Sequence, residues 1–174
     1  MNPSPRLRTV LATTVIVAVG AAGATASSLH SAALKITPSG VGGVKIGKTY
    51  KQLRQQGLIG KIQPGCELGG PNTRGARLKS PLKGSVTFTN QSPRKVTNIT
   101  IDGGAKARGV GIGDTIPEIK SAFPKAKVDH STDHTFLLTL VRIPKNGGGK
   151  MEFGVSTKSK KVTTMGVPFI AFCE

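Results

Sequence analysis

Two stretches of this chain decide its fold: Val44-Lys-Ile-Gly47-Lys-Thr49-Tyr-Lys-Gln-Leu53-Arg54 and Val110-Gly-Ile-Gly113-Asp-Thr115-Ile-Pro-Glu-Ile119-Lys120. Their glycines, threonines and apolar residues coincide at an offset of 66 positions. Residues 84–88 match 149–153 at an offset of 65, and residues 95–101 match 161–167 at 66 again. Three matches in the same order predict that the chain contains two copies of one small unit.

Each unit is predicted to be a short helix followed by strands. Thr49 with Gln52, and Thr115 with Glu118, have the spacing of a capping box at a helix start. Alternation of apolar and polar residues follows in both copies, and it predicts Phe88 and Phe153 at equivalent strand sites. The second copy has a further strong strand pattern at 136–143, whose counterpart at 66–83 is weak and rich in glycine.

These patterns predict an α+β fold made as a tandem repeat. Unit 1 covers residues 36–103 and unit 2 covers 104–174, each a short helix followed by an antiparallel hairpin or small sheet. The two units are expected to form one compact domain, because 148 residues suffice for one shared core.

The N-terminus has the layout of a secretory signal. Arg6 and Arg8 precede an uncharged run of 16 residues, and Ala24-Thr25-Ala26 forms an A-x-A site. We expect residues 1–26 to be removed, residues 27–35 to be a flexible lead-in, and the protein to be secreted. Retention as an anchor is the alternative, although the run is shorter than the roughly 20 residues of a membrane span.

The two cysteines, Cys66 and Cys173, are predicted to pair as a disulfide, since exported proteins with two cysteines usually bond them. An intermolecular bond or two free thiols is the alternative.

Other residues that could act as catalytic groups or metal ligands are few. Residues 129–134 gather two aspartates and two histidines that could hold a divalent ion, but a polar loop explains them better. The sequence offers no nucleophile with a base, so we expect no catalytic residue, no cofactor, no metal and no enzyme activity.

The helix start G-x-T-x-x-x-L, the small sheet after it and the duplication resemble the β-lactamase-inhibitor-protein-like fold. Outer-membrane assembly lipoproteins of the SmpA/OmlA type are similar to a single unit. Residues 36–47, 109–115 and 123–124 are also similar to many secreted proteins of actinobacteria. The resemblance covers about 36–174 and implies a fold. Inhibition through an aromatic surface is not implied, because the chain has no Trp and its one Tyr, Tyr50, is expected in the core.

We base the expected function on the net charge of the chain. Without Arg6 and Arg8 the chain has 23 lysines and arginines against 8 acids, a formal charge of +15. We expect a secreted, non-catalytic binding or structural protein of the cell envelope whose basic surface attracts an anionic polymer, with Lys158, Lys160 and Lys161 as candidate contacts. The alternative is a secreted inhibitor that docks its sheet on an exported enzyme. Nucleic acid is not an expected partner, since export and the scarcity of stacking aromatics disfavour it.

Overall fold

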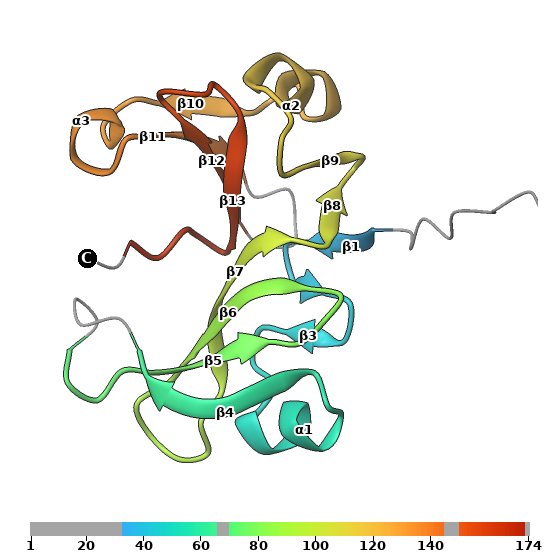
Figure 1. Ribbon diagram of the computed structural model, residues 1–174, viewed down its shortest axis with the longest axis vertical. Helices are drawn as coiled ribbons and strands as arrows, with labels where there is room; N and C mark the ends of the chain where they lie inside the picture. Colours follow the sequence, from blue (N-terminus) through green and yellow to red (C-terminus); the bar gives the residue numbers. More distant parts are fainter. Residues whose placement is uncertain (1–32, 66–69, 145–149, 173–174) are drawn as a thin grey trace, which may run out of the picture. The chain divides into compact units, whose positions relative to one another are not determined.

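The computed structural model describes residues 33–65, 70–144 and 150–172, and Figure 1 shows how their elements are arranged. Within this part of the chain the fold is mostly β, with three short helices, as expected for a sheet-rich α+β protein. The elements are β1 (Leu34–Thr37), β2 (Gly40–Val41), β3 (Val44–Lys45), α1 (Tyr50–Gln55), β4 (Ile59–Pro64), β5 (Arg74–Leu78), β6 (Lys83–Phe88), β7 (Val96–Gly103), β8 (Ala105–Ala107), β9 (Val110–Gly111), α2 (Ile116–Ala122), β10 (Lys127–Asp129), α3 (Asp133–Phe136), β11 (Leu138–Ile143), β12 (Met151–Ser156) and β13 (Val162–Val167).

One large antiparallel sheet organises the molecule. Its eight strands lie in the order β10-β11-β12-β13-β7-β6-β5-β4, so β7 and β13 form the central pair. A smaller five-stranded sheet has the order β3-β2-β1-β8-β9. Strands β4, β5, β6 and β7 follow one another in chain order from one edge of the large sheet to its centre, and β10, β11, β12 and β13 do so from the other edge. We call residues 33–103 the first half and 104–172 the second half.

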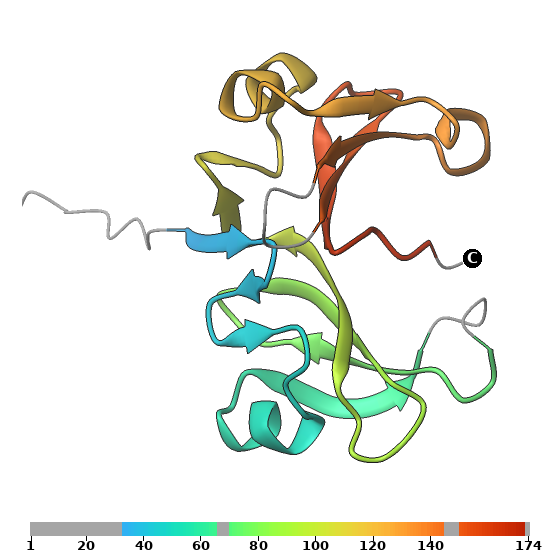
Figure 2. The ribbon, with the colours of Figure 1, turned by 180° about the vertical axis from the view of Figure 1, so that it is seen from behind.

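The core lies between one face of the large sheet and the elements that cover it. Strand alternation turns Val86, Ile99 and Phe153 to this face, and each is nearly or fully buried. Leu53 of α1 and Ile119 of α2 are fully buried against the same core. Figures 1 and 2 show α1, α2 and the small sheet on one side of the large sheet, and the C-terminal segment on the other.

Both helices begin at the predicted caps. In α1, the hydroxyl of Thr49 accepts from the backbone N–H of Gln52 at 3.2 Å, and Gln52 Oε1 accepts from the backbone N–H of Thr49 at 2.9 Å. In α2, one carboxylate oxygen of Glu118 accepts from both the backbone N–H and the hydroxyl of Thr115, each at 2.7 Å. Each cap satisfies donors that a helix N-terminus leaves unpaired.

The structure corrects the alignment of the strands. Phe88 and Phe153 are both buried on strands, but Phe153 pairs with Met165 and Phe88 pairs with Val96. The strand partner of Ile99, which the sequence alignment matches to Met165, is Val86. The counterpart of Phe153 is therefore Val86, two residues before Phe88. The prediction was wrong because it took the length difference to lie in the hairpin turn.

Three further elements differ from the expectation. The glycine-rich segment of the first half forms a regular strand, β5, between β4 and β6. Residues 133–136, expected at the boundary of a loop and a strand, form the short helix α3. Strand β1 begins at Leu34, inside the stretch expected as a lead-in, because Leu34 and Lys35 pair with Ala105 and Lys106 of β8.

The predicted signal at 1–26 and both cysteines, Cys66 and Cys173, lie outside the described residues. Across the described ranges no helix is long and apolar enough to span a bilayer.

Candidate functional site

The face of strands β4–β7 that points away from the core is polar. We call it the open face and define it by Gln63, Arg77, Ser85, Thr87 and Thr100. Strand register joins these residues into two rows, because Arg77 pairs with Ser85 and Ser85 with Thr100, while Gln63 and Thr87 both pair with Gly75. Arg77, Ser85, Thr87 and Thr100 have buried residues on both sides along their strands, and Gln63 follows Ile62, which packs against the core, so these side chains point in the opposite direction.

Cations gather on and beside the open face. Arg77 lies in β5 and is exposed, and exposed Lys61 lies in the irregular part of β4 beside it. Lys79 and Lys83 flank the turn between β5 and β6, and both are exposed. We call Lys61, Arg77, Lys79 and Lys83 the basic group. Their proximity follows from the strand pairing and not from any run of charge in the sequence.

The described part of the first half contains a single acid, Asp102, which lies beside Gly103, the strand partner of Lys83, and accepts from Thr164 Oγ1 at 3.0 Å. Residues 33–65 and 70–101 contain twelve lysines and arginines and no aspartate or glutamate. The ion pairs among the described residues all lie in the second half. With twelve cations against one acid, the described part of the first half carries an excess of positive charge, which attracts anions over about one Debye length, roughly 10 Å at 0.1 M salt.

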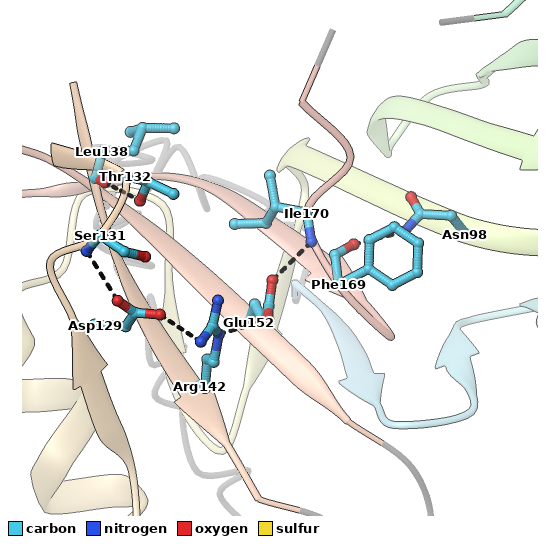
Figure 3. Close-up of polar contacts among 9 residues, drawn as sticks. All are labelled: Asn98, Asp129, Ser131, Thr132, Leu138, Arg142, Glu152, Phe169 and Ile170. Carbon is cyan, nitrogen blue, oxygen red and sulfur yellow. Dashed lines mark hydrogen bonds and ion pairs between the residues drawn. The ribbon is translucent and has the colours of Figure 1, made fainter. Parts of the chain in front are cut away.

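The corresponding face of the second half is covered by the chain itself. We call residues 168–172 the strap. The backbone N–H of Ile170 donates to Glu152 Oε2 at 3.0 Å, and the side-chain amide of Asn98 donates to the backbone oxygen of Phe169 at 2.5 Å (Figure 3). The ring of Phe172 stacks on that of Phe136 with centroids 4.1 Å apart. Ile170 is buried, so the strap seals this part of the sheet.

Two arginines occupy equivalent places on the two halves. Register sets one row across the whole sheet, made of Arg77, Ser85, Thr100, Gly166, Glu152, Arg142 and Lys127. Arg77 and Arg142 each lie two strands from the central pair. Arg142 forms ion pairs with Asp129 and with Glu152, the latter at 3.1 Å from Nε to Oε1 (Figure 3).

The first half has neutral residues where the second half has these acids. Ser85 pairs with Arg77 as Glu152 pairs with Arg142. Gln63 pairs with Gly75 as Asp129 pairs with Leu140, one row further along. The same strand positions therefore hold a closed charge network in one half and an unpaired arginine in the other.

The acidic and histidine cluster at 129–134 is engaged in local contacts. Asp129 Oδ1 accepts from the backbone N–H of Ser131 at 2.8 Å, and this hydrogen bond, together with nearby Arg142, lowers the pKa of Asp129. Asp133 contacts His130 Nδ1 at 2.8 Å and accepts from Thr139 Oγ1 at 2.8 Å, and the contact with His130 lowers the pKa of Asp133. Within the described residues no three such side chains converge as metal ligands would.

Lys158, Lys160 and Lys161 lie in and just after the turn between β12 and β13, and all three are exposed. They belong to a different hairpin from the basic group, so the structure does not bring the two sets onto one strand pair. Sequence reasoning chose them for their density and missed Lys61, Arg77, Lys79 and Lys83. The scarcity of acids in the first copy, where residues 36–103 contain two acids against eleven lysines and arginines, was the signal that could have found that group.

Comparison of the chain with protein-family models, with curated proteins and with solved structures finds no match.

Proposed function

We propose that this is a secreted, non-catalytic protein of the cell envelope that binds an anionic polymer through the open face. The observation that carries the proposal is the contrast between Arg77 and Arg142. The sheet supplies two carboxylates to one arginine and none to its equivalent. With Lys61, Lys79 and Lys83 beside it, Arg77 remains available for a negative partner.

The character of the open face favours a polymer over a folded protein. Tight protein interfaces are usually anchored by buried aromatic or large apolar side chains, and the rows of the open face hold amide, hydroxyl and guanidinium groups. Among the described residues the exposed large apolar side chains are Ile46, Ile112, Leu137 and Phe169, none of which belongs to the open face. Single exposed charge contacts are weak, so a partner must engage several cations at once, as a repeating polyanion does.

Tandem duplication of one unit is part of the proposal, with a fold like that of the β-lactamase-inhibitor-protein-like family. Matched backbone hydrogen bonds support it: Gly47 N–H donates to Val96 at 2.8 Å, and Gly113 N–H donates to Val162 at 2.9 Å. The Thr97 hydroxyl donates to the backbone of Thr87 at 3.2 Å beside a register shift, as the Thr163 hydroxyl does to Gly154 at 3.4 Å.

The sharpest test transplants the acids of the second half into the first. The double variant Gln63→Asp, Ser85→Glu should pair Arg77 as Asp129 and Glu152 pair Arg142. We expect it to elute from immobilised teichoic acid at much lower salt than the parent protein. The control is Thr135→Glu, Ser121→Glu, which changes net charge equally at exposed helix positions of the second half and should elute close to the parent.

Two results would overturn the proposal. Equal loss in both double variants would show that only net charge matters. Retention unchanged at 1 M salt, where the Debye length is about 3 Å, would show that apolar contacts hold the partner, and the inhibitor alternative would then be preferred.

A second surface is proposed at Lys158, Lys160 and Lys161, which are solvent-exposed. Charge reversal at all three should lower the eluting salt concentration without changing the unfolding midpoint. Reversal of Lys106, Lys120 and Lys150, three exposed lysines elsewhere in the same half, is the control. If both triple variants lose retention equally, the turn has no specific part in binding.

A further inference from the structure

A cavity of about 560 Å³ lies beside the second half, away from the open face. It is bounded by β1, by the chain after α2, and by the ends of β11 and β12. Its walls are mainly apolar and include buried Ile36, Phe123 and Met151, with Pro38, Pro124 and Ile143 beside them. The volume falls within the range of roughly 300–1,000 Å³ that is usual for sites of small molecules.

The charged residues that line this cavity are all cations. Lys35, Arg108 and Lys125 line it, each is exposed, and no aspartate or glutamate is among the lining residues. Exposed positive groups beside an apolar interior give the site two chemically different parts. A ligand that matches both has an apolar body and a negative end.

The cavity arises where the two halves differ. Leu58 lies 66 positions before Pro124, and in the first half its side chain packs over the turn between β2 and β3. A Cβ added at Gly43 in that turn would lie 2.7 Å from Leu58 Cδ1. Proline at 124 has no side chain of that reach, and Pro124 is one of the residues that line the cavity.

Arg108 holds a strained backbone conformation at this cavity. Its φ is 49°, and the first half has a glycine, Gly42, with φ of 52° at the matching turn position. A non-glycine residue in the left-handed region costs of order 1–3 kcal/mol, and such strain is concentrated at functional sites. The Arg108 guanidinium lies 5.1 Å from the centroid of the Phe123 ring, and Nη1 donates to the backbone oxygen of Ala122 at 3.3 Å. These contacts hold the charge beside the apolar wall.

We propose that this cavity binds a small amphiphile with one anionic head group and an apolar body. The apolar part displaces water from the space between Ile36, Phe123 and Met151, which is favourable in proportion to the apolar area buried. The head group stays at the solvent-facing side beside Arg108, Lys35 and Lys125. The site is separate from the open face and does not depend on the polymer-binding proposal.

The test uses dodecanoate as the probe and dodecanol as its uncharged counterpart, with binding to the purified protein measured by calorimetry. We expect one dodecanoate per chain and at least tenfold weaker binding of dodecanol. Arg108→Gly should weaken dodecanoate binding about tenfold and leave the unfolding midpoint unchanged or raised, because glycine relieves the left-handed strain. Lys125→Gln should weaken it several-fold, and Lys51→Gln, a change at an exposed lysine on α1 that does not line the cavity, should have no effect.

A cavity-filling variant tests the location independently of charge. Ala126 is half-buried and lines the cavity, so Ala126→Leu should abolish dodecanoate binding and leave elution from teichoic acid unchanged. The proposal is overturned if the parent protein binds no dodecanoate below millimolar concentration. It is equally overturned if dodecanol binds as well as dodecanoate, or if Arg108→Gly and Ala126→Leu both bind like the parent.

Discussion

Arg77 and Arg142 stand at equivalent positions of one sheet and have opposite surroundings. Arg142 lies between Asp129 and Glu152, and Glu152 also binds the backbone of Ile170. Arg77 has Ser85 on one side and the lysine-bearing irregular stretch of β4 on the other. In the second half the charges are used internally to hold the strap. In the first half the corresponding arginine, Arg77, forms no ion pair among the described residues.

The comparison shows that a few side chains give the two halves different charge environments. The backbone pairing is preserved, so the shared fold needs neither arrangement of charge. Gln63 and Ser85 against Asp129 and Glu152 decide which arginine is neutralised. The strap also covers the outward face of the second half, so the open face of the first half is the more accessible of the two. Variants at matched positions of the two halves test this contrast, from the largest expected effect to the smallest.

Gly166→Ala should be the most damaging single change on the sheet. A Cβ at this position would lie 2.2 Å from the backbone oxygen of Phe169 and 2.4 Å from the nitrogen of Ile170. The strap must move away, and we expect a loss of about 3 kcal/mol in the free energy of unfolding, as for overpacked sites, with faster proteolysis of the C-terminal segment. Thr100, its partner across the central pair, is half-buried and its hydroxyl donates to Asn98 Oδ1 at 3.3 Å. Thr100→Ala should cost less than about 1 kcal/mol, and equal costs would contradict a closely seated strap.

Glu152→Ala should destabilise the protein by about 2 kcal/mol, because it leaves the backbone N–H of Ile170 unpaired in a buried place. Ser85→Ala, the matched change in the first half, should cost a few tenths of that. Urea unfolding of both variants measures the difference. Glu152→Gln should restore part of the loss, since its amide oxygen can still accept from Ile170. Equal effects of the two alanine variants would mean that the strap contributes little.

Arg77→Ala should affect polymer binding, and Arg142→Ala should affect the stability of the fold. Arg77→Ala should reduce the salt dependence of polymer binding by about one released counterion, because one cation no longer meets the polymer, and it should leave unfolding unchanged. Arg142→Ala should leave elution from the polymer unchanged and lower stability by about 1 kcal/mol, a modest value because this side chain is 50% exposed. The reverse assignment of the two effects would refute the functional difference between the halves.

The two helix caps should differ in their response to pH. Hydrogen bonds from Thr115 lower the pKa of Glu118, so the folded protein binds this proton less readily than the unfolded chain. The contribution of Glu118 is therefore present above about pH 4.3, the ordinary value for glutamate, and is lost as the pH falls through its lowered folded pKa. Gln52 at the matching position of α1 does not titrate. Glu118→Gln should flatten the change in urea midpoint between pH 6 and pH 3, and Gln52→Glu should steepen it. Identical slopes in all three proteins would exclude a role for the cap.

Local sequence patterns predicted the starts of α1 and α2 correctly, but they did not predict the register of the strands. Thr49-x-x-Gln52 and Thr115-x-x-Glu118 marked both helix starts, because a capping box is made within four residues. The register of β6 and β12 depends on where an extra residue enters a strand, as at Thr97 and Thr163. Such a bulge is set by the neighbouring strands, so alignment by residue type placed Phe153 opposite the wrong counterpart. The strap could not be foreseen, because Gly154 and Gly166 carry no signal of the chain that crosses them.

By itself, the sequence determined the capped helices, the apolar alternation that makes a sheet with one buried face, and the strongly basic composition. These depend on neighbours a few residues apart, whose geometry the chain fixes locally. Only the tertiary structure decided that Asp129, Arg142 and Glu152 meet, that residues 168–172 lie over them, and that Arg77 meets no acid among the described residues. Contacts between distant strands are chosen by register and burial over the whole sheet, and a charge acquires its role from the partners that this packing brings to it.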